Sequence, residues 1–152
     1  MRVLGVVPTS TDLKWAIVEG QRGSPTLLAA PTKTQKLPVD QDQGQVLQGL
    51  YRLVSTFLKE QGVEKVCVLQ AGNSKFGGPS AVRIKAEAIF QLVGADLSVQ
   101  TDLVPPQTLR ALEKKFTDQT GGTPESVFNG GDDFVPKPWR DAVLVAWVGL
   151  DA

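Results

Sequence analysis

The chemistry open to this chain is bounded by the residue types it contains. Among its 152 residues there is no histidine and one cysteine, Cys67. Histidine-dependent nucleophilic catalysis and the usual zinc sites are therefore excluded. Cys67 lies in an apolar run, which indicates a buried strand, and a lone cysteine cannot form an internal disulfide. Any metal chemistry must therefore depend on carboxylates.

Carboxylates that could bind Mg²⁺ or Mn²⁺ occur in three places. Asp12 follows the first apolar run, Asp132 and Asp133 lie in a Gly-rich segment, and Asp141 begins the last apolar run. Phosphodiester cleavage by two metals needs several carboxylates around cations about 4 Å apart, so these four could form a nuclease site. The simpler interpretation is that the first three form turns, and that Asp141 stabilises the N-terminus of a helix.

A second candidate site is basic. Lys75, Arg83 and Lys85 surround a Gly-rich segment and the predicted start of a helix, where backbone N–H groups favour anions. The segment does not match a P-loop, which requires Gly-Lys-Ser/Thr at a defined spacing. We expect these residues to bind a phosphate of nucleic acid, and the alternative is an ordinary glycine-containing surface loop.

The elements that must position these residues follow from hydrophobic periodicity and turn residues. Three strands come first, then helices alternate with two further strands, and a long Gly- and Asp-rich loop precedes a buried last helix. The predicted strands cover 3–7, 14–19, 26–30, 63–70 and 96–103; the helices cover 43–61, 80–93, 105–116 and 139–150; the loop covers 117–138.

Two stretches of sequence carry a resemblance. The first hairpin reads Arg2-Val3-Leu4-Gly5-Val6-Val7-Pro8, then Lys14-Trp15-Ala16-Ile17-Val18-Glu19, and a later stretch reads Lys75-Phe76-Gly77-Gly78, then Lys85-Ala86-Glu87-Ala88. The hairpin resembles the RNase H-like superfamily, in particular its RuvC-type branch. The later stretch resembles an uncharacterised bacterial family of small RuvC-like proteins.

The resemblance implies an α/β fold of the RNase H-like type in a single domain, 1–152. Its sheet would have five strands, three antiparallel followed by two parallel, with helices on both faces. RuvC-type nucleases hold catalytic metal with an Asp in the first strand, a Glu at the end of the fourth strand and acids in the last helix. At these positions the chain has Val7, Gln70 and Asp141. A valine cannot ligate a hard cation, and a glutamine lacks the charge of glutamate, so tight metal binding is expected to fail.

The resemblance and the substitutions together predict a catalytically degenerate RuvC-like protein that acts as a nucleic-acid or protein binding module. The alternatives are a metal-dependent nuclease with a rebuilt carboxylate site, and a structural subunit or homodimer without a ligand. The 16 basic and 16 acidic residues give no net charge, so nucleic acid would have to be held by a local basic patch. No apolar run is long enough to cross a membrane, and with the single thiol this favours the cytoplasm.

Overall fold

One mixed β-sheet organises the computed structural model, which describes residues 1–28, 32–72, 80–128, 134 and 136–152. Its strands follow the order β3-β2-β1-β5-β6, and β4 also pairs with β2. The first three strands are antiparallel, and β5 and β6 run parallel to β1. The strands are β1 (Arg2–Pro8), β2 (Asp12–Gln21), β3 (Ser24–Leu28), β4 (Thr34–Lys36), β5 (Lys65–Leu69) and β6 (Gln100–Val104).

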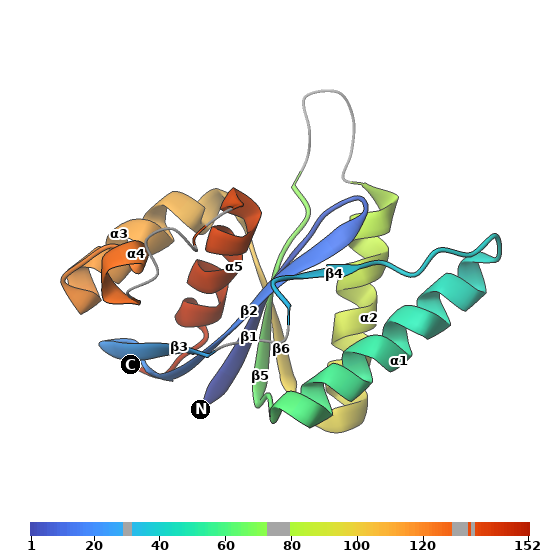
Figure 1. Cartoon of the computed structure of the whole chain (residues 1–152), viewed down its shortest axis with the longest axis horizontal. Helices are drawn as coiled ribbons and strands as arrows, with labels where there is room; N and C mark the ends of the chain where they lie inside the picture. The colour runs from blue at the N-terminus through green and yellow to red at the C-terminus, as the bar shows by residue number, and fades with distance from the viewer. Residues whose placement is uncertain (29–31, 73–79, 129–133, 135) are drawn as a thin grey trace.

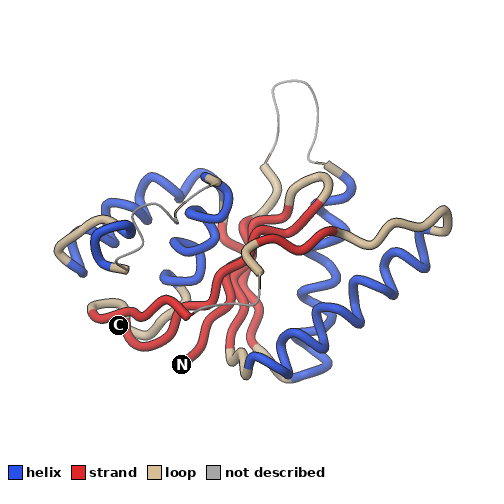
Figure 2. The backbone as a smooth tube through the Cα atoms, viewed as in Figure 1, coloured by secondary structure: helices blue, strands red, loops and turns tan. Residues whose placement is uncertain are grey.

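Helices cover both faces of this sheet, as Figure 1 and Figure 2 show. Helices α1 (Gln43–Gln61) and α2 (Ala81–Leu97) pack on one face. Helix α5 (Lys137–Val148) packs on the other, and α3 (Leu109–Thr120) and the short α4 (Pro124–Val127) pack against α5. A 3-10 turn, η1 (Pro106–Thr108), leads into α3. Within the described residues, no helix combines the length and apolar character needed to span a membrane.

The expected arrangement of three antiparallel strands followed by two parallel strands is confirmed, with one strand added. Strand β2 has ten residues, and β3 pairs only with its second half. The short β4 pairs with its first half, so the sheet has six strands rather than five. The sequence Thr34-Gln35-Lys36 of β4 is polar and lacks an apolar pattern, which explains why it was not predicted.

Helix α5 lies closer to the sheet than an ordinary side chain would allow. A Cβ atom built on Gly5 of β1 would lie 2.0 Å from the carbonyl oxygen of Ala142 and 2.5 Å from the backbone nitrogen of Ala146. Residues 142–147 of α5 are at most 1% exposed. Gly5 therefore allows the α5 backbone to rest directly on the central strand, which fixes where the first turns of α5 lie.

The prediction of α1 at 43–61 is confirmed, but α2 and β6 differ from the predicted bounds. Helix α2 continues through Gly94 to Leu97, and β6 begins at Gln100 instead of Asp96. A Cβ on Gly94 would lie 2.1 Å from Oγ1 of Thr101, so this glycine permits helix–strand packing and does not end the helix. Its role is a close approach to β6, which composition alone does not reveal.

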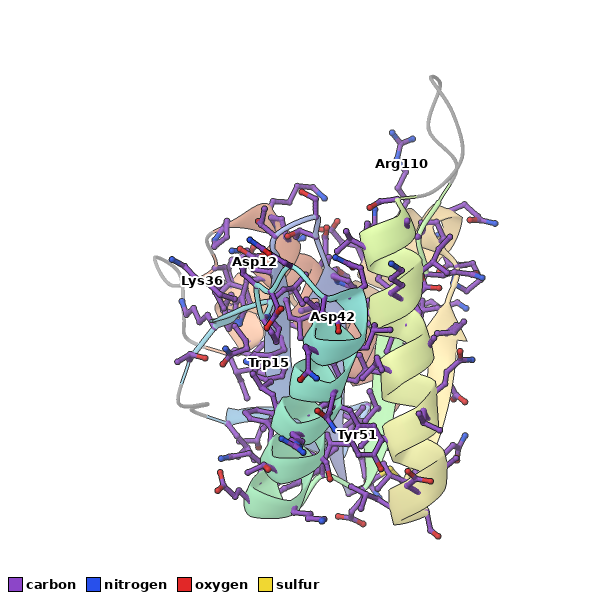
Figure 3. The ribbon with its side chains drawn as sticks, turned by 90° about the vertical axis from the view of Figure 1, so that its right-hand side faces the viewer. Asp12, Trp15, Lys36, Asp42, Tyr51 and Arg110 are labelled. Atoms are coloured by element: carbon purple, nitrogen blue, oxygen red, sulfur yellow. The ribbon has the colours of Figure 1, made fainter. Side chains whose placement is uncertain are left out.

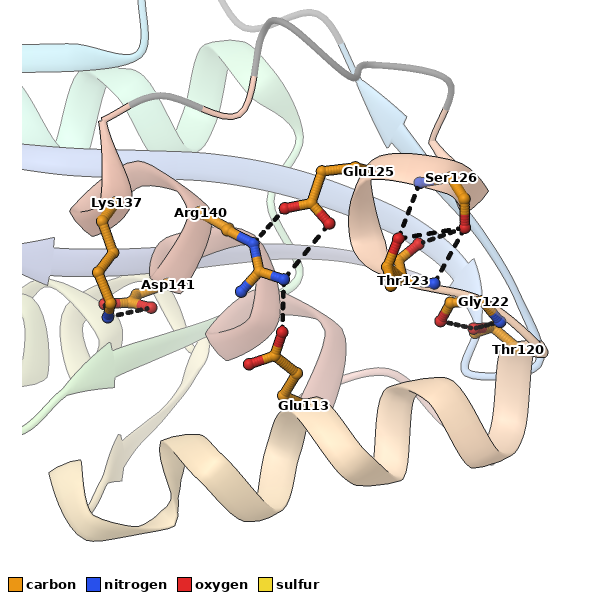
Figure 4. Close-up of polar contacts among 9 residues, drawn as sticks. All are labelled: Glu113, Thr120, Gly122, Thr123, Glu125, Ser126, Lys137, Arg140 and Asp141. Atoms are coloured by element: carbon orange, nitrogen blue, oxygen red, sulfur yellow. Dashed lines mark hydrogen bonds and ion pairs between the residues drawn. The ribbon is translucent and has the colours of Figure 1, made fainter.

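The segment predicted as one long loop contains helical structure. Helix α3 extends to Thr120, and α4 follows with a capping box between Thr123 and Ser126. Arg140 of α5 donates to Glu125 of α4 and to Glu113 of α3, the latter at 2.6 Å (Figure 4). The partly buried guanidinium of Arg140 thus connects three helices, so the segment is fixed at α4 by ion pairs as well as by packing.

The Arg140–Glu125 contact predicts an acid-sensitive contribution to stability. The hydrogen bond from Arg140 holds the pKa of Glu125 below its ordinary value of 4.5. The contribution is therefore full above that ordinary value and is lost as the pH falls through the lowered pKa of the folded state. We expect Glu125→Gln to reduce the free energy of unfolding by about 1 kcal/mol at neutral pH, measured by urea denaturation.

The difference between Glu125→Gln and the unmodified protein should shrink towards zero at an acidic pH below the lowered pKa of Glu125, where both side chains are uncharged. Glu60→Gln, which changes an exposed carboxylate of α1, serves as the matched control and should change stability little at either pH. An equal cost of Glu125→Gln at both pH values would contradict the ion-pair explanation.

Candidate functional site

Val7 is buried near the end of the central strand. It pairs with Lys14 of β2, is 6% exposed, and belongs to a core cluster that includes Leu69, Trp139 and Ala142. Leu69 ends β5, and Trp139 and Ala142 belong to α5, so this cluster joins the ends of β1 and β5 to the last helix. An isopropyl group here contributes packing and offers no lone pair to a cation.

Gln70 directly follows β5 at the same end of the sheet. Its backbone N–H donates to the carbonyl of Val104 at 2.8 Å, and its side chain is partly exposed. The next residue, Ala71, donates its backbone N–H to the carboxylate of Glu87 from α2. Glu87 is 7% exposed, so a buried carboxylate accepts from the backbone of the residue that follows Gln70.

Glu87 was not among the predicted site residues, although the sequence contained a signal for it. The other buried residues of α2 include Ala86, Ile89, Phe90 and Val93, so Glu87 is an acid on an otherwise apolar helix face. A buried carboxylate is retained only where donors satisfy it, and here the donor is a strand-end backbone amide. The position lies within the stretch that carries the family resemblance.

Asp141 lies on α5 and already has a cationic partner. Both of its carboxylate oxygens accept from Nζ of Lys137, at 3.0 and 3.2 Å (Figure 4). Helix α5 begins at Lys137, so Asp141 starts the second turn and not the first turn as the sequence suggested. The side chain of Asp141 is 13% exposed. A metal ion that bound this carboxylate would have to compete with the ammonium group of Lys137.

Asp12 is engaged in the turn between β1 and β2. Its carboxylate accepts from Oγ1 of Thr9 at 2.7 Å and from Nζ of Lys14 at 3.2 Å, and Figure 3 shows it near Lys36. Asp132 and Asp133 lie outside the described residues. Within the part of the chain that the structure describes, no three His, Cys, Asp or Glu side chains are grouped so that they could hold a metal ion.

The described side chains therefore do not fit the metal site implied by the resemblance. Val7 supplies no ligand, Gln70 supplies no charge, and Asp141 is already paired with Lys137. Divalent cations of the magnesium type require oxygen ligands with net negative charge, and such a set is not assembled by these three positions.

At the start of α2, one buried side-chain donor lacks an acceptor among the described residues. Ser80 precedes the helix, but its side chain makes no capping hydrogen bond. The buried Nε of Arg83, in the first turn, has no hydrogen-bond partner among the described residues. Lys85 is exposed and donates to Oε1 of Gln43 at 3.4 Å, and Lys75 lies outside the described residues. A helix N-terminus with an unsatisfied arginine favours an anion.

Arg83 precedes Glu87 by one helical turn, so the start of α2 and the end of β5 form one region. Arg110, at the start of α3, projects from the same end of the molecule in Figure 3 and is exposed. The sequence did not single out Arg110, because one arginine in a helix has no pattern. We use the name "strand-end region" for Val7, Gln70, Arg83, Glu87 and Asp141.

Comparison with solved structures identifies the fold. Thermus thermophilus RuvC in complex with Holliday junction substrate matches with a TM-score of 0.74 at 15% sequence identity, covering 97% of this chain and 91% of that one. A second structure of Thermus thermophilus RuvC matches with a TM-score of 0.67 at 16% identity, covering 97% and 92%. The fowlpox virus Holliday junction resolvase gives 0.50 at 11% identity, covering 97% and 92%.

The protein thus has the RNase H-like fold in its RuvC form, as the first hairpin and the later stretch indicated. Residues 1–122 match the family model described as "Protein of unknown function (DUF3010)". The chain belongs to that family. The search of the curated proteins found no match.

Proposed function

We propose that this protein is a RuvC-like module that has lost nuclease activity and binds branched nucleic acid. The observation that carries the proposal is Val7, an apolar side chain 6% exposed at the place where a RuvC-type site requires a carboxylate. Gln70 and the Lys137–Asp141 ion pair support it, because Gln70 carries no charge and Asp141 already pairs with a lysine. Cleavage by metal-activated water would require negative charges at these positions.

The binding part of the proposal depends on the basic side of the strand-end region. The buried Nε of Arg83 has no partner among the described residues, Ser80 does not cap α2, and Lys85 and Arg110 are exposed nearby. Phosphate oxygens would satisfy both the guanidinium and the first N–H groups of α2. Lys75 belongs to the same proposal by its place in the sequence just before α2. The structural relative with the TM-score of 0.74 was solved with a Holliday junction substrate, which suggests the type of nucleic acid to test.

We expect the protein to bind a four-way DNA junction at low salt, and Lys75→Ala/Lys85→Ala to weaken that binding. Each lysine that neutralises a phosphate contributes about one unit to the slope of log affinity against log salt concentration. The double variant should therefore lower the slope by about two units, measured by fluorescence anisotropy across a salt series. Lys59→Ala/Lys114→Ala removes the same charge from the last turn of α1 and from α3, and serves as the matched control.

Three results would decide against this function. Calorimetry that shows Mg²⁺ or Mn²⁺ binding at sub-millimolar affinity, abolished by Asp141→Ala, would contradict the loss of the metal site. Junction cleavage with either metal would contradict the loss of activity. No association with junction, single-stranded or duplex DNA at low salt would instead favour a module that binds a protein partner or a second copy of itself.

A metal-dependent nuclease is the second candidate, and the position of Glu87 favours it. Glu87 places a buried carboxylate beside the end of β5, where a RuvC-type enzyme has its glutamate. Glu87, Asp141 and Asp12 are not grouped closely enough to hold a metal ion, so a rebuilt site for two cations would also need Asp132 or Asp133, which lie outside the described residues. In that case Glu87→Gln should abolish both metal binding and cleavage. In the binding-module proposal, the same variant has no metal-dependent effect.

A further inference from the structure

A cavity of about 600 Å³ opens over β5 and β6, on the face of the sheet covered by α3 and α5. It contains none of Val7, Gln70 and Asp141, so it is separate from the strand-end region. Its volume lies within the range of about 300–1,000 Å³ that small-molecule sites occupy. The apolar part of the lining is Cys67, Leu103, Val104, Pro105, Leu112 and Val148.

Arg22 stands at one wall of this cavity and is held rigidly. Its Nη2 donates to the carbonyl of Val148 at 2.7 Å, its backbone N–H donates to Asp151, and its carbonyl accepts from Nε1 of Trp147 at 2.9 Å. Its guanidinium carbon lies 6.0 Å from the centre of the Trp147 ring. A guanidinium fixed in this way loses little conformational entropy when it binds a ligand.

The same guanidinium has an unsatisfied donor. The Nε atom of Arg22 is buried and, among the described residues, makes no hydrogen bond. A buried donor of a charged group without a partner costs free energy, and native proteins almost always supply a partner. Because this atom is shielded from solvent, it does not itself open into the cavity, but it shows that the protein satisfies the Arg22 guanidinium only in part.

The charge around the cavity is positive although the chain as a whole is neutral. Arg22, Lys65 and Lys115 line it, and the carboxylate in the lining is Asp102, which pairs with Lys65 at 3.4 Å. Burial raises the pKa of Cys67 to about 12, so this thiol is neutral at physiological pH and adds no negative charge. Two positive charges therefore remain beside a lining that is partly apolar and partly polar.

We propose that this cavity binds a small organic anion, in which a carboxylate or phosphate contacts Arg22 and Lys115 and an apolar body packs over β5 and β6. The shared chemistry is an oxyanion on an apolar group. The rigid Arg22 supplies orientation, and the exposed Lys115 supplies charge at the opening. The proposal stands independently of nucleic-acid binding, because it uses other residues.

The test is a titration of the whole protein with phenyl phosphate, benzoate, inorganic phosphate and the uncharged benzyl alcohol, followed by calorimetry and by amide NMR. We expect phenyl phosphate or benzoate to bind and to shift the amide signals of Thr108 and Gly149, which line the cavity. Lys115→Glu should weaken binding by roughly tenfold or more, as expected for reversal of a charge near a bound anion. Lys114→Glu, at the neighbouring exposed position of α3, is the matched control and should change binding little.

Arg22→Gln should also weaken binding of the anions. If Arg22→Gln fails to fold, Lys115→Glu still decides the test, because Lys115 is an exposed residue of α3. The proposal is overturned if none of the probes binds at millimolar concentration. It is also overturned if benzyl alcohol binds as tightly as the anions, if inorganic phosphate binds as tightly as phenyl phosphate, or if Lys114→Glu and Lys115→Glu have equal effects.

Discussion

Gly5→Ala is expected to lower the free energy of unfolding by more than about 3 kcal/mol, and thus to remove a large part of the stability of an ordinary domain. The added methyl group would lie 2.0 Å from the carbonyl oxygen of Ala142 and 2.8 Å from the Cβ of Ala146. Both atoms belong to α5, whose central residues are fully buried against the sheet. The helix would have to move away from β1, and the packing of Val3, Cys67 and Leu144 would loosen with it.

Chemical denaturation followed by circular dichroism measures this effect. Gly23→Ala is the matched control, because the nearest atom to a Cβ at that position is 3.9 Å away. We expect that variant to be within about 0.5 kcal/mol of the unmodified protein. A cost below about 1 kcal/mol for Gly5→Ala would contradict this prediction. It would show that α5 can move away from β1 without loss of packing.

Val7→Asp is expected to destabilise the protein by about 3 kcal/mol or more. Val7 is 6% exposed within an apolar cluster, so the substitution would bury an unpaired carboxylate. The double variant Val7→Asp/Gln70→Glu restores acids at the two positions that the family resemblance groups with Asp141. We expect millimolar Mn²⁺ to restore about 1–3 kcal/mol of stability to this double variant, because a ligand that binds only the folded state stabilises it. Thermal denaturation with Mn²⁺ and with a chelator measures the difference.

The control is Val7→Asn/Gln70→Glu, which has a polar side chain of similar size but one carboxylate fewer. It should be destabilised without a gain from Mn²⁺, because a neutral amide does little to offset the repulsion between cations. If Mn²⁺ stabilises the unmodified protein as much as the double variant, the native strand-end region already holds a metal and the proposal of lost catalysis fails. If Mn²⁺ does not stabilise the double variant, the carboxylates at positions 7, 70 and 141 do not lie close enough together to bind one metal ion.

Much of the fold could be predicted from the sequence because burial patterns are local. Helix α1 begins after Asp42, whose side chain accepts from the backbone N–H of Gly44, and it ends at Gly62 with φ +62°. Both signals are present in the sequence, so the predicted bounds of 43–61 are those observed. Helix α2 was predicted too short because Gly94 has a packing role, and a glycine in sequence does not distinguish a stop from a close approach.

The candidate site was less predictable because it depends on contacts between distant residues. The sequence indicated Val7 and Gln70 only through the family resemblance, and nothing in the sequence shows that Lys137 pairs with Asp141. Glu87 reaches a backbone amide 16 residues away in sequence, which periodicity cannot reveal. The unsatisfied Nε atoms of Arg22 and Arg83 are likewise properties of the folded chain.

The division of β2 between two short partners has a consequence for self-association. Strand β3 pairs with Ile17–Gln21 and β4 with residues 12–14, so the outer edge on this side consists of two short strands instead of one long one. The opposite edge, β6, has five residues and includes Asp102. Short and charged edges resist the addition of a strand from another molecule. If copies of this protein assemble, they are therefore expected to meet through helical faces, and amyloid-like stacking from the native state is disfavoured.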